Sequence, residues 1–269
     1  MLKTLKLRQT SLPTSAAIWA SLLLEEMTQR QTPDAGTLMH RVGLPPDSWQ
    51  QAVLRSLASR LLLLCSRQSG KSATCAVLAL HTALIQPGSL TLLLSPSLRQ
   101  SQELFKKVQD TYRALGNPVP LQAESALRLE LSHGSRIISL PGTESTIRGY
   151  SGVSLLVIDE AARVADELYY AVRPMLAVSG GRLIALSTPF GKRGWLHQEW
   201  TEGEGWERVK VTADQCPRIS PAFLAAERRS LPAMWFQSEY MCEFTDTVDQ
   251  VFLYEDVQAA LSSEVQPLF

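Results

Sequence analysis

The stretch Leu61-Leu-Leu-Leu-Cys65-Ser-Arg-Gln-Ser-Gly70-Lys71-Ser72 decides the fold of this chain. Its four leucines predict a buried strand, and residues 73–85 have a helix-compatible composition. Strand, loop and helix around Gly-Lys-Ser suit phosphate binding, because the helix start offers backbone N–H groups, the lysine reaches phosphate oxygens and the hydroxyl binds Mg²⁺. We therefore predict a site for ATP and Mg²⁺ that consists of Ser66, Arg67, Gln68, Ser69, Gly70, Lys71 and Ser72.

Two residues of this loop are unusual. Cys65 stands where the common pattern has its first glycine. The prediction of a phosphate loop therefore depends more on the flanking strand and helix than on Gly70-Lys71-Ser72 alone. Arg67 could be a solvated loop arginine, or its guanidinium could brace the γ-phosphate or a neighbouring lobe. Beside a triphosphate the second interpretation is favoured. We predict catalytic roles for Lys71 and Arg67.

A second apolar strand, Ser154-Leu-Leu-Val-Ile-Asp159-Glu160, ends in two carboxylates. Ligands bind at the carboxyl edge of such a sheet. Asp159 is suited to hold Mg²⁺ through water, and Glu160 is suited to polarise the attacking water as the general base. The alternative is a solvated acidic pair at the start of a helix. The phosphate loop upstream favours the catalytic interpretation.

Three further segments carry candidate residues. The strand Leu183-Ile-Ala-Leu-Ser187-Thr188-Pro189 ends in hydroxyls that could sense the γ-phosphate, although Ser-Thr-Pro also suits an ordinary turn. Trp49 and Gln50 precede the first strand, where they could meet an adenine, unless the tryptophan simply packs in the core. Arg148 lies in a Gly- and Ser-rich loop eleven residues before Asp159 and could reach a neighbour's nucleotide, or be a turn arginine.

Short apolar runs predict the fold class. They span 61–64, 90–94, 136–140, 155–158 and 183–186, and helical stretches separate several of them. Runs of this length suit a mostly parallel sheet covered by helices on both faces, that is, an α/β fold. Together with the phosphate loop, this pattern resembles the P-loop NTPase (RecA/ASCE-like) class. We predict an N-terminal helical and lid segment (1–43) with a break at Thr32-Pro33-Asp34, an ATPase core (44–200), a C-terminal lid segment (201–252) that contains a strand at 206–212, and a tail (253–269). The N- and C-terminal segments together are expected to form a small lid subdomain.

Composition narrows the class of protein. A chain with 45% hydrophobic and 19% charged residues is globular and not disordered. Because 26 basic residues balance 26 acidic ones, net charge predicts no nucleic-acid partner, although a local basic face could still supply one. The four cysteines lack metal-ligand spacing, and no run approaches the roughly 18 apolar residues of a membrane span. We predict a cytoplasmic protein without a membrane partner.

Taken in order, these motifs resemble the ATPase half of the phage large terminases, in which the phosphate loop commonly lacks the first glycine and carries an arginine at the position of Arg67. The likeness extends to Ser95-Pro96-Ser-Leu-Arg99-Gln100, His133-Gly134-Ser135-Arg136-Ile137, Ile147-Arg148-Gly149-Tyr150-Ser151-Gly152, Ser187-Thr188-Pro189-Phe-Gly191 and Gln237-Ser-Glu239-Tyr240-Met-Cys242-Glu243-Phe244. It implies Gln50 at the adenine, Ser187 and Thr188 as a coupling motif, and Arg148 as a finger for the adjacent subunit.

The resemblance also implies a setting. Such motors drive double-stranded DNA into a procapsid as homo-oligomeric rings, commonly pentamers on the capsid portal, and their partners are the portal protein and the small terminase subunit. Large terminases usually continue into a nuclease domain beyond the position of Val251-Phe252, so we expect no DNA cleavage by this polypeptide. The alternatives are a helicase-like or remodelling ATPase, which a missing second RecA-like half disfavours, and a non-catalytic nucleotide-binding scaffold.

Overall fold

An eight-stranded sheet forms the centre of the structure, with the strand order β3-β4-β5-β2-β6-β7-β1-β8. The structure is a computed structural model that describes residues 34–142, 147, 149–246 and 260. Five strands coincide with the apolar runs: β1 (Arg60–Cys65), β2 (Leu90–Ser95), β5 (Arg136–Pro141), β6 (Leu155–Asp159) and β7 (Arg182–Ser187). They pair in parallel, which confirms the predicted α/β fold.

The strand order brings the two chemical motifs to one edge of the sheet. β7 lies between β1, which leads into the phosphate loop, and β6, which ends at Asp159. In the register of these strands, Ser187 pairs with Leu64 of β1, and Leu186 pairs with Asp159 of β6. Because parallel strands end at the same edge, the hydroxyl, the acids and the loop become neighbours.

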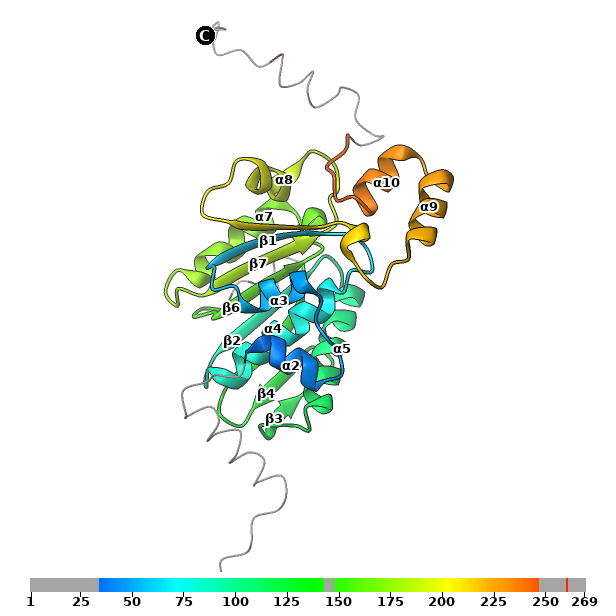
Figure 1. Cartoon of the computed structure of the whole chain (residues 1–269). Helices are drawn as coiled ribbons and strands as arrows, with labels where there is room; N and C mark the ends of the chain where they lie inside the picture. The colour runs from blue at the N-terminus through cyan, green and yellow to red at the C-terminus, as the bar shows by residue number, and fades with distance from the viewer. Residues whose placement is uncertain (1–33, 143–146, 148, 247–259, 261–269) are drawn as a thin grey trace, which may run out of the picture.

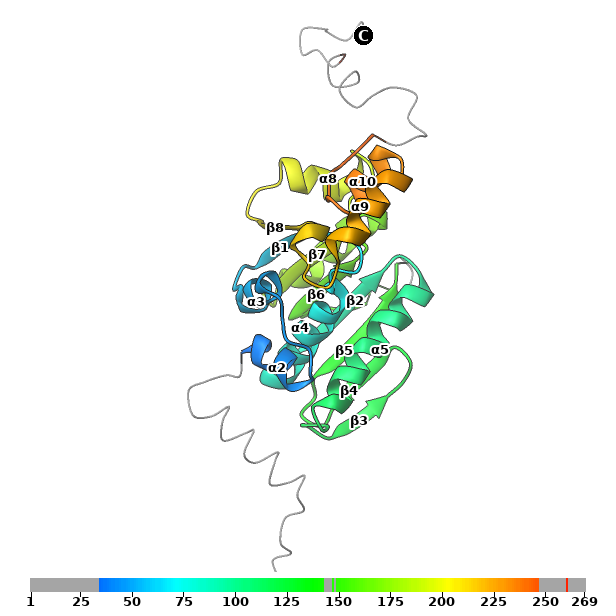
Figure 2. The same ribbon diagram turned by 45° about the vertical axis from the view of Figure 1, so that its right-hand side comes forward.

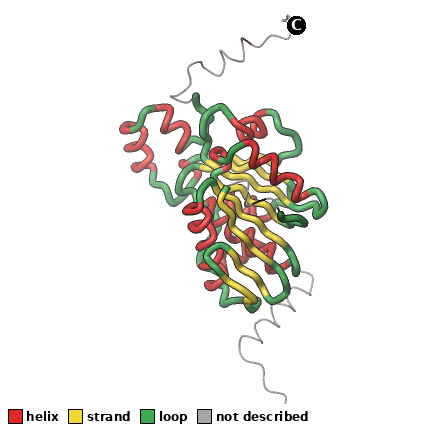
Figure 3. The backbone as a smooth tube through the Cα atoms, turned by 180° about the vertical axis from the view of Figure 1, so that it is seen from behind, coloured by secondary structure: helices red, strands yellow, loops and turns green. Residues whose placement is uncertain are grey.

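Helices cover both faces of the sheet. On one face α2 (Ala35–Arg41), α3 (Ser48–Arg55), α4 (Lys71–Ile85) and α5 (Leu98–Ala114) share a hydrophobic cluster (Figure 1). On the other face, seen from behind in Figure 3, α7 (Asp166–Val172) and α8 (Gly194–Thr201) pack into a second cluster. Short 3-10 helices connect the elements: η1 (Ala161–Arg163), η2 (Arg173–Leu176) and η3 (Ala213–Gln215).

The break predicted at Thr32-Pro33-Asp34 is described only at Asp34, whose carboxylate caps α2 by accepting a hydrogen bond from Gly36 N. Residues 1–33 lie outside the described residues, as does nearly all of the tail at 253–269. Within the described chain, α2 packs against the core helix α4 in a common cluster. The proposed division into four segments stays a prediction.

Strand β8 (Glu207–Val211) corrects one expectation. We expected this strand in the C-terminal lid, but it pairs in parallel with β1 from Leu61 to Cys65 and so forms an edge of the main sheet. The sequence of one strand does not indicate which other strand it pairs with, because pairing depends on the rest of the sheet. The opposite edge is an antiparallel hairpin of β3 (Leu121–Glu124) and β4 (Arg128–Leu131) that we did not predict, because β3 is exposed along its whole length.

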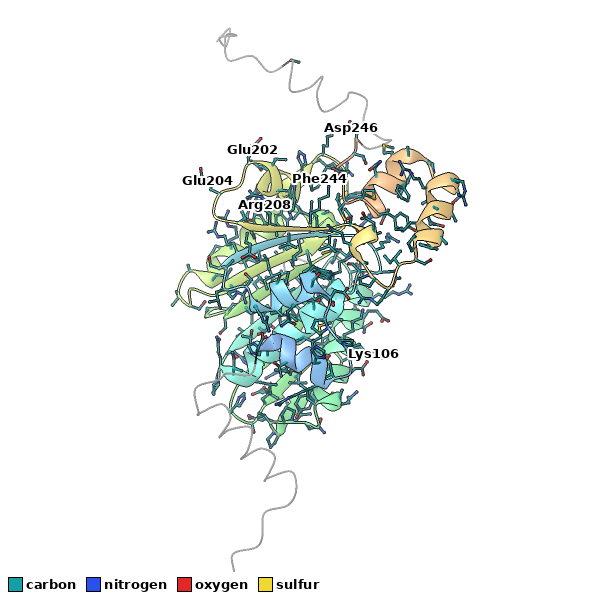
Figure 4. All side chains as sticks on the ribbon, viewed as in Figure 1. Lys106, Glu202, Glu204, Arg208, Phe244 and Asp246 are labelled. Carbon is teal, nitrogen blue, oxygen red and sulfur yellow. The ribbon has the colours of Figure 1, made fainter. Side chains whose placement is uncertain are left out.

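Two helices after β8, α9 (Pro221–Ser230) and α10 (Ala233–Glu239), lie together near one end of the sheet (Figure 2). Beyond them the chain returns to α8. The Phe244 ring packs edge-on against His197 at 4.8 Å, and the Asp246 carboxylate pairs with Lys192 at 3.2 Å. Phe244 and Asp246 are labelled in Figure 4. Within the described residues, no helix is long and apolar enough to cross a membrane.

Candidate functional site

The phosphate loop enters α4 through two residues in the left-handed backbone region, Gln68 (φ 60°) and Gly70 (φ 94°). The positive φ of Gly70 favours glycine there, and an added Cβ would also lie 2.9 Å from the side-chain nitrogen of Gln50. Cys65, in contrast, is a fully buried strand residue that pairs with Val211 and has no positive φ. The loop therefore does not need glycine at its first position.

A clamp from two distant segments holds the loop. The Ser69 hydroxyl donates to the carbonyl of Ser66 at 2.9 Å, and the Ser69 carbonyl accepts a 2.7 Å hydrogen bond from the Arg218 guanidinium. The same guanidinium donates two hydrogen bonds to the carboxylate of Asp47, at 2.8 and 2.7 Å. Arg218 follows β8 and Asp47 caps α3, so this clamp could not be seen in the sequence.

Gln50 lies against the loop and is buried, with 1% of its surface exposed. Its amide nitrogen donates to Thr74 Oγ1 at 3.0 Å and to the Gly70 carbonyl at 3.4 Å, while its oxygen accepts from Asp47 N at 2.9 Å. Trp49 is partly buried against the same cluster. Protein groups thus occupy the amide of Gln50, and its role at an adenine stays a prediction.

We expect Gln50→Ala to lower the free energy of unfolding by about 2 kcal/mol without nucleotide, because it leaves buried polar groups of the loop unpaired. Thermal denaturation of the apo protein measures this loss, and ATP-over-GTP preference in a binding titration tests the adenine role separately. Gln51→Ala is the matched control, since Gln51 follows on the same helix and donates to Asp34. Equal loss in both variants would contradict the support assigned to Gln50.

Lys71 and the two acids form the charged centre of the site. The Lys71 ammonium is nearly buried and lies 3.5 Å from the Glu160 carboxylate. Glu160 has a left-handed backbone (φ 49°), which is costly for a residue with a side chain and typical of functional positions. Its N–H donates to Asp159 Oδ1 at 3.0 Å. Burial, followed by the charge of Glu160, raises the pKa of Asp159 to about 6, against the opposing charge of Lys71.

The donor set fits Mg²⁺. Ser72, at the start of α4, supplies a hydroxyl and Asp159 a buried carboxylate, both of them oxygen ligands that this hard cation prefers. Among the described residues, no lysine or arginine forms an ion pair with Asp159, so its buried charge lacks a direct counterion. A divalent cation would remove that cost.

A cavity of about 490 Å³ opens over these groups, a size usual for small-molecule sites. Its walls include Arg67, Gln68, Gly70, Lys71, Ser72 and Glu160 from the predicted set, together with Gln100, Lys107 and Arg163, which we did not predict as site residues. Ser66, Ser69 and Asp159 are buried and do not line it. Four cationic side chains and one carboxylate suit a polyanion such as a triphosphate. Gln100 and Lys107 are seven residues apart on α5, a spacing that could have identified them.

Arg67 connects the loop to the lid helix α10. Its Nε lies 2.6 Å from Glu239 Oε2, and its backbone N–H donates to the Glu239 carbonyl at 3.2 Å. Oε2 has no hydrogen-bond donor among the described residues, so the side chains attract as charges and not through a directed hydrogen bond. Arg67 thus contacts α10 and also lines the cavity, and both roles considered for it stay predictions.

Ser187 links the end of β7 to the acidic segment. Its hydroxyl accepts from Ala162 N at 3.2 Å and donates to the Thr188 carbonyl at 2.6 Å. One residue further along, the Pro189 carbonyl accepts a 3.0 Å hydrogen bond from Ser238 of α10. The segment at 187–189 thus bonds both to η1, which follows the acidic strand, and to α10. Arg148 lies outside the described residues, so its role as a finger stays a prediction.

Comparison with known proteins identifies the family. The model of the family described as "Terminase large subunit, T4likevirus-type, N-terminal" matches residues 62–259, which is most of the chain. The chain belongs to the large terminase family. A curated relative, the terminase large subunit of Thermus phage G20c, is 27% identical over 260 residues, which cover 83% of this chain and 53% of the relative.

Solved terminase structures share the fold. The ATPase domain of the Thermus phage P74-26 large terminase superposes with a TM-score of 0.68 at 23% identity, over 77% of this chain and 97% of that domain. The large terminase of bacteriophage HK97 gives a TM-score of 0.64 at 14% identity, over 80% of this chain and 55% of that one. This terminase chain spans about half the length of the curated relatives it matches.

Proposed function

We propose that this chain is the ATP-hydrolysing motor of a viral DNA-packaging terminase, which couples Mg²⁺-dependent ATP hydrolysis to translocation of double-stranded DNA into a procapsid. One observation carries the proposal: a single cavity presents Lys71, Ser72 and Glu160 together on the predicted phosphate loop and acidic strand. Membership of the large terminase family supports it.

In this proposal each side chain has a distinct task. The start of α4 and the Lys71 ammonium bind the β- and γ-phosphates through charge-assisted hydrogen bonds. Ser72 and Asp159 would hold Mg²⁺, and the bound ion would supply charge neutralisation at the phosphates. Glu160, whose side chain is 22% exposed, accepts the proton of the attacking water. The charge of Lys71 opposes the rise that burial causes in the pKa of Asp159.

Two contacts would couple hydrolysis to movement. Ser187 and Thr188 join the acidic strand to Pro189, which bonds to the lid, while Arg67 joins the phosphate loop to the lid through Glu239. Loss of the γ-phosphate alters the charge that Arg67 and the acidic strand experience. The lid receives that change through α10, the helix that both contacts reach.

We further propose that the chain acts in the host cytoplasm as a homo-oligomeric ring, a pentamer on the portal protein, with the small terminase subunit as a partner. ATP turnover measured against protein concentration, with and without double-stranded DNA, tests the motor assignment. We expect turnover per subunit to rise with concentration as rings form. Turnover absent at every concentration would refute the proposal, and strand separation by the parent protein would favour a helicase-like ATPase instead.

We expect Arg148→Ala to lower turnover by about 10³-fold if Arg148 serves the neighbouring subunit, because a finger in trans stabilises transition-state charge. Mixing these subunits with Glu160→Gln subunits should restore part of the turnover, since the latter still present Arg148 to intact sites. The control partner is the double variant Arg148→Ala, Glu160→Gln, which has no finger to give. A mixture no faster than its separate components would argue against action in trans.

A further inference from the structure

Arg163 is a cation of the nucleotide cavity to which the proposed mechanism assigns no task. It ends the short helix η1, three residues after Glu160, and its backbone N–H donates to the Glu160 carbonyl at 2.8 Å. Its side chain is exposed and lines the cavity that also contains Lys71 and Glu160. No carboxylate of the described residues forms an ion pair with it, so its charge is available for an anion.

The guanidinium of Arg163 rests instead on an aromatic ring. Its central carbon lies 4.0 Å from the centre of the Phe190 ring, and a second guanidinium, that of Arg193, lies 5.3 Å from the same centre. Phe190 directly follows Ser187-Thr188-Pro189. Phe190, the residue that follows the proposed coupling segment, thus contacts both guanidinium groups through one ring.

Phe190 also belongs to a second cavity, of about 270 Å³, between this segment and the lid. Arg193 lines it from the same side, and Trp235, Ser238 and Glu239 of α10 line it from the lid. Glu239 is the partner of Arg67, and Ser238 bonds to Pro189. The Arg163–Phe190 contact is therefore a direct connection between the nucleotide cavity and the surface where the lid packs.

We propose that Arg163 binds the terminal phosphate of the nucleotide, and that its exchange between this phosphate and the Phe190 ring reports the nucleotide state to α10. This inference rests on the proposed function. Lys71, which reaches the β- and γ-phosphates in that mechanism, pairs with Glu160, and Arg163 is anchored on the Glu160 carbonyl, so both cations share the phosphate end of the cavity.

Relative strengths decide the direction of the exchange. An exposed guanidinium gains little from an aromatic face, whereas hydrogen bonds between a guanidinium and a phosphate are among the strongest that proteins form. A triphosphate should therefore draw Arg163 away from Phe190. A diphosphate lacks the γ-phosphate, so Arg163 should return to the ring. A ligand shifts a conformation only through such a difference in contacts, and this pair of states provides one.

Binding of mant-ATPγS and mant-ADP, each with Mg²⁺, to the parent and to Arg163→Ala, Arg163→Lys and Arg193→Ala tests the contact. We expect Arg163→Ala to weaken ATPγS binding about tenfold and ADP binding less than twofold, with Arg163→Lys in between. Retained ADP binding shows that the variant folds. Arg193→Ala is the matched control, because Arg193 faces the same ring but does not line the nucleotide cavity. An unchanged ATPγS-to-ADP ratio in Arg163→Ala overturns the inference.

Hydrogen exchange at residues 233–239 tests whether the bound nucleotide affects α10 through Arg163. In the parent we expect exchange rates that differ at least twofold between the ATPγS and ADP complexes, and a clearly smaller difference in Arg163→Ala and Phe190→Leu, which keep the Arg67–Glu239 and Pro189–Ser238 contacts. Phe190→Leu should keep the ATPγS-to-ADP affinity ratio. A nucleotide-dependent difference in Arg163→Ala that is as large as in the parent contradicts the effect of Arg163 on α10. If the parent binds and hydrolyses ATP and Arg163→Ala has the same nucleotide affinities and exchange rates, this inference alone is refuted. If the parent binds no nucleotide, the proposed function is refuted as well.

Discussion

Replacing Glu160 by glutamine is expected to lower kcat for ATP by roughly 10²- to 10⁴-fold, the range that a positioned general base contributes. The amide keeps the size of the side chain but cannot accept a proton from water. Affinity for ATP should be retained or increased, because the carboxylate 3.5 Å from Lys71 no longer competes with the phosphates for that ammonium. Phosphate release gives kcat, and a fluorescent-nucleotide titration gives Kd.

Glu167→Gln provides the control for this substitution. Glu167 is an exposed acid in the first turn of α7, seven residues further along the chain and outside the cavity, so its removal should change neither kcat nor Kd appreciably. Turnover of Glu160→Gln within fivefold of the parent would show that another group activates the water. A parallel loss of ATP affinity would instead indicate a disturbed loop.

Replacing Lys71 by alanine is expected to weaken ATP binding by about 10- to 100-fold, since hydrogen bonds to charged groups are worth about 1.5–3 kcal/mol. Lys71 begins α4, is nearly buried and lies 3.5 Å from Glu160. Its loss also leaves Asp159 and Glu160 without their nearest cation. Titration with ATP and with ADP measures the effect.

Lys106→Ala is the matched control for charge. Lys106 is exposed on α5 (Figure 4), next to Lys107, but does not line the cavity. Both variants remove one positive charge, so a general effect of net charge on nucleotide binding would appear in both. Equal affinities of Lys71→Ala and the parent would contradict the phosphate site, whatever the effect on turnover.

Several features of this site could be predicted because they depend on neighbouring residues alone. The strand at 61–64, the Gly70-Lys71-Ser72 turn and the acids after 155–158 follow from apolar runs and glycine placement, and the structure has each where it was expected. The parallel sheet also follows, since strands buried on both faces show continuous apolar runs. Cys65 needed the structure, which shows that its position requires burial and not glycine.

Other features depend on partners far along the chain. The Arg218–Asp47 clamp, the Arg67–Glu239 pair and the placement of β8 beside β1 join residues that lie 171, 172 and about 146 positions apart. A sequence pattern can indicate that a strand pairs with another strand. Which strand it pairs with, and which distant side chains meet, depends on strand order and register across the whole sheet.

The sequence by itself determined that this protein has a parallel α/β core with a phosphate loop and an acidic strand, because apolar periodicity and glycine placement act locally. Only the tertiary structure decided how these parts communicate. In the structure Gln50 bonds to Thr74 beside the loop, Arg67 contacts Glu239 of α10, and Arg163 lies between the nucleotide cavity and Phe190. Such contacts arise from packing of the complete chain, and no short segment contains the information for them.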